Sequence, residues 1–125
     1  MTKLNFILAS GSKYRKELLL QHHLHAEQID PQVDEALIKD ENPGARALRL
    51  GNEKAESVVK SRMPVKPWLV LASDQVCHMN GDIFRKPQSA EIASEHLTEF
   101  SGRWVTFSTS LVLIDYKYQL IEIVE

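Results

Sequence analysis

The chain has 125 residues, a formal net charge of −2 and 43% hydrophobic residues. This is enough apolar material for one domain with a buried core, and it excludes an intrinsically disordered chain. The fifteen basic and seventeen acidic residues lack the basic excess of proteins that bind nucleic acid polymers. No apolar run approaches the roughly 20 residues of a membrane-spanning helix. With one cysteine and no signal-peptide pattern, we expect a cytoplasmic protein without membrane or nucleic-acid partners.

The first half of the sequence predicts alternating strands and helices. Leu4–Ala9 is apolar and suits a buried strand, and the turn that follows leads into a helix over Lys13–Gln21. Ala26–Val33 includes a short strand, followed by an acidic loop. Asn42 is a typical N-cap before Pro43, and apolar residues keep a helical period from Pro43 to about Arg62. Histidines between the first helix and the short strand are expected to be solvated rather than to bind a metal: His22, His23 and His25.

The second half predicts more strands. Trp68–Ala72 is expected to be a central buried strand that ends on a polar segment, Ser73-Asp74-Gln75. A hairpin with a turn at Asn80-Gly81 then follows. The remaining expected elements are the second hairpin strand at Asp82–Phe84, a helix from Ser89 to Phe100, and strands at Trp104–Ile114 and Gln119–Glu125. Because the last strand pattern reaches Glu125 without a cap, we expect residues 1–125 to be one domain that is incomplete at its C-terminus.

Four groups of polar residues are candidates for chemistry. Small residues and positive charges in Ser10–Lys16, at the start of a helix, suit a phosphate, although a solvated basic turn fits them equally well. The acidic pair Asp34-Glu35 is either solvated or a ligand for a hard metal ion. Asp74 follows an apolar strand and therefore needs a partner. Lys54 and Lys86 are the fourth group, and each one alone would be taken for a surface lysine.

Together these groups favour metal-assisted hydrolysis of a phosphoanhydride. The acidic residues suit a divalent metal and the basic ones suit phosphates, while no Ser–His or Cys–His pair indicates covalent catalysis. Cys77 lies in a hairpin without an obvious base, so we expect it to serve packing. The P-loop and Gly-x-Gly-x-x-Gly patterns are absent.

Several of these segments, in this order and spacing, resemble the Maf family of nucleoside triphosphate pyrophosphatases. Lys13 stands where the family usually has proline. The matching segments are Leu8–Arg15, Val33–Glu35, Leu48–Ala55, Ser73–Gln75, Gly81–Ile83, Lys86-Pro87 and Phe100–Gly102. The resemblance implies an α/β fold with a long, twisted mixed sheet flanked by helices, and with a nucleotide cleft between two lobes. It also implies hydrolysis between the α- and β-phosphates, which gives a nucleoside monophosphate and pyrophosphate.

The resemblance also assigns roles to residues. It implies that Asp74 activates the attacking water and that Glu35 and Asp74 hold a divalent cation, Mg²⁺ or Mn²⁺. The positions that it implies for substrate contacts are Ser10, Ser12, Tyr14, Arg15, Lys54, Gln75 and Lys86.

Two features resemble the branch of the family that acts on 7-methyl-GTP. They are the sequence Ser73-Asp74-Gln75-Val76-Cys77 and the aromatic residue Tyr14, whose face would stack on a cationic methylated base. Two alternatives stay open: a catalytically weak nucleotide-binding protein and a regulator of cell division. We expect this chain, as an enzyme, to be weakly active, because the missing part of the family's length would carry further cleft residues. We also expect a homodimer, because the missing C-terminal part would leave apolar side chains and a strand edge exposed near Leu111, Leu113, Ile121 and Ile123.

Overall fold

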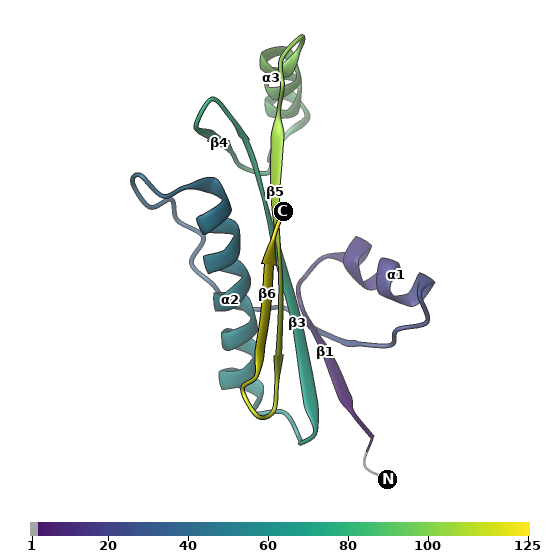
Figure 1. Cartoon of the computed structure of the whole chain (residues 1–125). Helices are drawn as coiled ribbons and strands as arrows, with labels where there is room; N and C mark the ends of the chain where they lie inside the picture. Colours follow the sequence, from purple (N-terminus) through teal and green to yellow (C-terminus); the bar gives the residue numbers. More distant parts are fainter. Residues whose placement is uncertain (1–2) are drawn as a thin grey trace.

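The computed structural model describes residues 3–125 as a six-stranded mixed sheet with three helices (Figure 1). This confirms the expected α/β class, and most of the expected elements differ from the observed ones by no more than two residues at an end. The elements are β1 (Asn5–Ala9), α1 (Lys13–Gln21), β2 (Glu27–Ile29), α2 (Pro43–Arg62), β3 (Trp68–Met79), β4 (Asp82–Phe84), α3 (Ala90–Phe100), β5 (Thr106–Asp115) and β6 (Leu120–Val124).

The strand order is β2-β1-β3-β5-β6, and β4 pairs with the end of β3. β1 runs parallel to both of its neighbours, β2 and β3, and their connections contain α1 and α2. The pairs β3–β4, β3–β5 and β5–β6 are antiparallel. β3 and β5 are the two longest strands. They pair from Leu69 opposite Asp115 to His78 opposite Thr106, which is almost the whole length of the sheet.

The expected end of a strand at Ala72 is wrong. β3 is one continuous strand of 12 residues, so Asp74 lies in its middle rather than after its end. The polar residues from Ser73 to Gln75 stay extended because β5 pairs with β3 along this whole stretch. β1, by contrast, stops at Ala9, opposite Ala72, and β4 begins to pair only at Cys77. Between these two points β3 therefore pairs with β5 alone.

The core lies between α2 and one face of the sheet. Figure 1 shows α2 along this face and α1 on the opposite side of the sheet. The buried apolar residues of α2 are Ala47, Leu50, Ala55 and Val58, and they meet a sheet face that includes Val70, Ala72 and Val112. The expected helix start is confirmed, because the Asn42 side chain accepts hydrogen bonds from Gly44 N–H and Ala45 N–H and Pro43 occupies the first turn.

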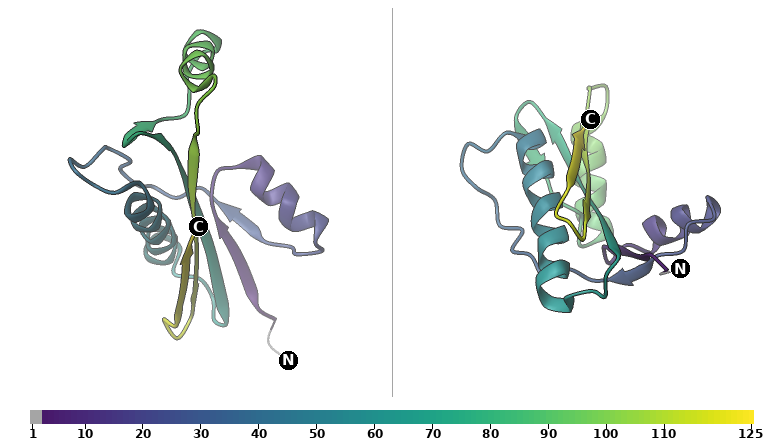
Figure 2. Two further views of the ribbon diagram at one scale, coloured as in Figure 1. Left: turned by 45° about the horizontal axis from the view of Figure 1, so that its top comes forward. Right: turned by 60° about the horizontal axis from the view of Figure 1, so that its bottom comes forward.

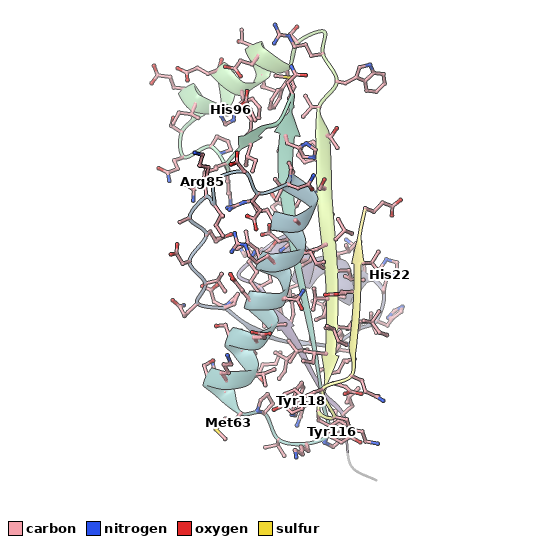
Figure 3. All side chains as sticks on the ribbon, turned by 60° about the vertical axis from the view of Figure 1, so that its left-hand side comes forward. His22, Met63, Arg85, His96, Tyr116 and Tyr118 are labelled. Carbon is pink, nitrogen blue, oxygen red and sulfur yellow. The ribbon has the colours of Figure 1, made fainter. Side chains whose placement is uncertain are left out.

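A smaller lobe, formed by β4, α3 and the paired ends of β3 and β5, lies at one end of the sheet, away from β1 (Figure 2). Edge-to-face contacts of Phe84 with His96 and Phe100 join α3 to β4. Figure 3 shows His96 and Arg85 at this end, and Met63, Tyr116 and Tyr118 at the opposite end. Neither α1 nor α3 has a buried residue, so the core depends on α2.

Candidate functional site

A cleft of about 1290 Å³ lies mainly along the side of the sheet away from α2, and its lining also includes Glu35 of the acidic loop and Lys54 of α2. It extends from the first turn of α1 to the smaller lobe, and its floor includes side chains of β3 and β5. Charged side chains from five segments of the chain line it: Lys13 and Arg15, Asp30, Glu35, Lys54, and Arg85 and Lys86. Basic residues outnumber acidic ones at its wall, which favours an anionic ligand.

The turn between β1 and α1 is held by its own side chains. Ser10 Oγ accepts a hydrogen bond from Ser12 N–H at 3.0 Å, and Ser12 Oγ caps the helix by accepting one from Arg15 N–H at 3.3 Å. The Arg15 guanidinium donates to the Ser73 carbonyl at 3.0 Å. Arg15 therefore satisfies a β3 carbonyl just beyond the stretch that pairs with β1, on the residue that precedes Asp74.

Lys54 joins two of the predicted acidic residues. Its Nζ atom is 2.8 Å from Asp74 Oδ1 and 3.9 Å from Glu35 Oε1. The Asp74 side chain is only 9% exposed and that of Lys54 14%, whereas that of Glu35 is 52% exposed. A buried carboxylate requires a partner of this kind, because an unpaired charge is costly in a low-dielectric interior. The structure thus brings Asp74, Lys54 and Glu35 together from β3, α2 and the acidic loop.

Two arginines that we did not predict hold the acidic loop. The Glu35 carbonyl accepts hydrogen bonds from Arg46 Nη2 at 2.7 Å and Arg85 Nη2 at 3.0 Å, and Arg46 also donates to the Ala36 carbonyl. Arg46 is only 5% exposed. These contacts fix the backbone that carries the Glu35 carboxylate. Their acceptors are main-chain carbonyls, which every residue has, so no sequence motif indicates them.

The other predicted substrate residues face the cleft without joining this cluster. Tyr14 is 84% exposed, and Lys86 is also exposed. Within residues 3–125, neither side chain has a hydrogen bond or an ion pair with another side chain. Gln75 Nε2 donates to Thr109 Oγ1 at 3.0 Å on the open face of the sheet. All three side chains line a surface that a ligand can reach.

The described residues supply at most two carboxylates for a metal. No group of three or more His, Cys, Asp or Glu side chains in residues 3–125 could hold an ion. Glu35 and Asp74 both lie within 4 Å of the Lys54 ammonium group, so a single cation is close to both. This set fits Mg²⁺, which typically takes one or two protein carboxylates and completes its shell with water and substrate phosphates.

The remaining candidates for chemistry have structural roles or none. Burial raises the pKa of the Cys77 thiol above its ordinary value, which keeps it protonated and unreactive at neutral pH. The histidines that follow α1 are exposed, as expected. No helix within residues 3–125 has the length and hydropathy that crossing a membrane requires.

A family model described as Maf-like protein matches residues 5–125. The relatives include a 7-methyl-GTP pyrophosphatase of Idiomarina loihiensis, 39% identical over 96% of this chain and 60% of the relative. Proteins of the same name from Xanthomonas campestris and Pseudomonas aeruginosa are 45% and 38% identical, over 86% and 95% of this chain and 55% and 60% of the relatives. The chain thus spans only 55–60% of the length of these curated relatives.

The fold is similar to that of a nucleoside-triphosphatase described as a dITP/XTP pyrophosphatase, from Mycobacterium abscessus. The TM-score is 0.54, and the match covers 97% of this chain and 70% of the other at 14% sequence identity. At this identity the likeness shows the fold alone, and it agrees with the expected α/β fold of a mixed sheet flanked by helices.

Proposed function

This chain belongs to the Maf family, and from that premise we propose that it hydrolyses the α–β phosphoanhydride of a nucleoside triphosphate. The products are a nucleoside monophosphate and pyrophosphate. The observation that carries the proposal is the pair of Asp74 and Lys54, held 2.8 Å apart beside a cleft with basic walls. Relatives that are 38–45% identical and named 7-methyl-GTP pyrophosphatase support the reaction and favour a methylated guanine nucleotide as substrate.

In this proposal the basic residues hold the triphosphate. Arg15 and Lys86 line the cleft from opposite ends, one from the first turn of α1 and the other from the segment after β4. Ser10 and Ser12 shape the turn through the hydrogen bonds described above, and this turn carries Arg15 at the wall of the cleft, within reach of an anion. Several positive groups around one cleft neutralise charge on the phosphates as it builds up during bond cleavage.

Asp74 and Lys54 act on the attacking water. The Asp74 carboxylate orients the water and accepts its proton while the oxygen attacks the anhydride, and pyrophosphate departs. While the two remain paired, the Asp74 oxygen that contacts Lys54 is not available to the water. A phosphate in the cleft attracts the Lys54 ammonium group, and the shift of Lys54 toward it frees Asp74 for the proton transfer.

A divalent cation, Mg²⁺ or Mn²⁺, belongs to the proposal as the cofactor. Glu35 and Asp74 would hold it together with the substrate phosphates. The cation would withdraw charge from the phosphates when bound. Glu35 is half-exposed beside the cleft, so its carboxylate is accessible to an ion that arrives with the nucleotide.

Tyr14 and Gln75 are proposed to select the base. Tyr14 offers an exposed aromatic face to a cationic methylated guanine, and the amide of Gln75 can pair with a base edge. Both side chains line the cleft, on segments close to the phosphate-binding turn.

We also propose a cytoplasmic homodimer that binds no nucleic acid polymer. β6 is an edge strand, and all five of its residues are exposed, four of them apolar. Such an edge can pair with the same strand of a second copy. Sedimentation at micromolar concentration tests this point: a dimer is expected, and a stable monomer contradicts it.

The function is tested with the purified 125-residue chain and a panel of 7-methyl-GTP, GTP, dTTP and UTP in the presence of Mg²⁺. We expect release of nucleoside monophosphate and pyrophosphate, with the highest kcat/KM for 7-methyl-GTP, and loss of activity in excess EDTA. Binding without turnover contradicts the enzymatic proposal. A higher kcat/KM for dTTP or UTP contradicts the proposed base selection, and full activity in EDTA contradicts the metal.

A further inference from the structure

Ser110 joins three parts of the site although it lies outside the cleft. Its side chain is fully buried on β5, opposite Asp74 in the strand register. The Ser110 hydroxyl donates to the Ala47 carbonyl of α2 at 2.7 Å. The same oxygen accepts a hydrogen bond from the Asp74 main-chain N–H at 3.1 Å. One hydroxyl group therefore ties the backbone of Asp74 to the helix that carries Lys54.

Gly51 provides the space that this hydroxyl occupies. A Cβ atom built on Gly51 would lie 2.6 Å from Ser110 Oγ and 3.1 Å from Val112 Cγ2. The first distance is shorter than any van der Waals contact allows, and Ser110 is held by two hydrogen bonds and cannot turn away without losing them. Glycine inside a helix costs about 1 kcal/mol relative to alanine. Here that cost permits the close approach of α2 and β5.

Gly51 also lies one turn before Lys54 on α2. Residues three apart on a helix project on the same side, so the surface of α2 that contacts Ser110 is continuous with the surface that presents Lys54 to Asp74. A displacement of α2 from β5 at Gly51 would therefore change the separation of Lys54 Nζ and Asp74 Oδ1.

We propose that Ser110 is a positioning residue that, in the space left by Gly51, fixes the distance between Asp74 and Lys54. Its effect on turnover rests on the proposed function, whereas its effect on the geometry of Asp74 does not. Ser110 touches no substrate in this account and acts only through the Asp74 main chain and the docking of α2.

The test uses three variants of the full chain: Gly51→Ala, Ser110→Ala and the double variant. Gly51→Ala is expected to lower the Tm by about 5–10 °C, because overpacking outweighs the gain in helix propensity. It is expected to lower kcat about 10- to 100-fold with little change in KM, since small displacements of reacting groups are costly. Ser110→Ala should lower kcat about 10-fold. The double variant lacks the Ser110 hydroxyl, so the new Cβ at position 51 no longer meets an atom at 2.6 Å. Part of the Tm and kcat lost in Gly51→Ala should therefore return.

The matched control is Gly44→Ala, a second glycine-to-alanine change in the same helix. A Cβ there would meet only the Asn42 side chain at 3.2 Å and Val124 at 3.6 Å. We expect kcat to stay unchanged and the Tm to change less than in Gly51→Ala, because the only close contact is with the Asn42 cap at the exposed end of the helix. The main-chain amide of Asp74 gives a readout that needs no turnover: its NMR proton shift should move upfield in Ser110→Ala and change in Gly51→Ala, but not in Gly44→Ala.

Two results would overturn the inference. One is an Asp74 amide that is unaffected by Gly51→Ala and Ser110→Ala, even where the Tm falls, because Ser110 would then have only a packing role. The other is a double variant in which the two losses simply add, because the close contact would then not couple the two residues. If the unchanged chain releases no pyrophosphate, the proposed function fails. The role of Ser110 is then still decided by the Asp74 amide shift and by comparing the Tm values of the two single variants with that of the double variant.

Discussion

The two faces of β3 differ in burial and in the kind of side chain that they carry. On the face toward α2, five alternate residues are all buried: Trp68, Val70, Ala72, Asp74 and Val76. On the other face the residues between them are half-buried or exposed: Leu69, Leu71, Ser73, Gln75 and Cys77. A single strand thus contributes both to the core and to the floor of the cleft.

This comparison separates two tasks of the site. The carboxylate with the proposed role in proton transfer lies on the packed face, where α2 and β5 fix its position. The side chains with a proposed role in base selection are those of Gln75, on the open face of β3, and Tyr14, on α1. Both are exposed. Substitutions on the packed face should therefore change turnover and strongly lower stability, and substitutions on the open face should change selectivity with a smaller loss of stability.

The largest expected effect is that of Asp74→Asn on the packed face. The change keeps the shape of the side chain but removes the charge that faces Lys54 and the attacking water. We expect kcat to fall at least about 100-fold, measured as release of pyrophosphate from 7-methyl-GTP. Glu56→Gln, at an exposed position of α2, is the control for loss of a negative charge. Turnover in Asp74→Asn equal to that of the unchanged chain contradicts the assignment.

The second prediction compares neighbours on opposite faces. Val70 is fully buried and Leu71 is half-buried, so Val70→Ala leaves a cavity whereas Leu71→Ala removes a group that already contacts solvent. We expect Val70→Ala to lower the free energy of unfolding by about 2 kcal/mol and Leu71→Ala by about 1 kcal/mol or less. Urea unfolding measures both. An equal or greater loss for Leu71→Ala, which removes the larger group, would contradict the difference between the faces.

The third prediction concerns the open side of the cleft. Tyr14→Ala should lower the preference for 7-methyl-GTP over GTP, expressed as a ratio of kcat/KM values, by about tenfold. This follows from the 1–3 kcal/mol that stacking of a base on an aromatic ring contributes. The Tm should not change, because Tyr14 is 84% exposed. Trp104→Ala, which removes an aromatic ring that is 94% exposed, is the control. An unchanged ratio for Tyr14→Ala rules out stacking on this ring.

The smallest expected effect lies in the segment that leads into α2. Arg49 binds Glu41 through two hydrogen bonds of 2.6 and 2.9 Å, and the hydrogen bond from Arg49 lowers the pKa of Glu41 below its ordinary value of 4.5. The pair therefore stabilises the fold above that pH, and its contribution is lost as the pH falls through the lowered pKa. Glu41→Gln should lower the Tm by a few degrees at pH 7. The difference from the unchanged chain should shrink well below pH 4.5, and a difference independent of pH contradicts this account.

Local signals in the sequence were sufficient to predict most elements. Asn42 and Pro43 marked the start of α2, and Asn80-Gly81 marked the hairpin between β3 and β4, where both residues have positive φ values. The continuity of β3 was not predictable in this way. It depends on pairing with β5, which begins 27 residues after β3 ends, and no local pattern encodes that pairing.

The site shows the same division between what is local and what is not. The types of Asp74, Lys54 and Glu35 and their order along the chain identified them as candidates. Their proximity results from the docking of α2 on the sheet. The supporting roles of Arg46 and Ser110 were not predicted, because each acts on main-chain groups. Gly51 was the one visible signal, since a glycine inside an amphipathic helix often marks a close approach.

β1 ends at Ala9, opposite Ala72, and leaves the following edge of β3 without a partner strand. This has a mechanical consequence. Between Ser73 and Val76 β3 has a strand partner on one side only, so the sheet narrows there to β3, β5 and the end of β6, and a narrow ribbon twists more readily than the interior of a wide sheet. This stretch connects the main part of the sheet to the smaller lobe, so we expect any rotation of one part against the other to occur there. The Arg15 guanidinium takes the place of the missing neighbour at the Ser73 carbonyl. An anion that draws Arg15 away would relax this joint, and occupancy of the cleft would thereby be coupled to torsion between the two parts of the molecule.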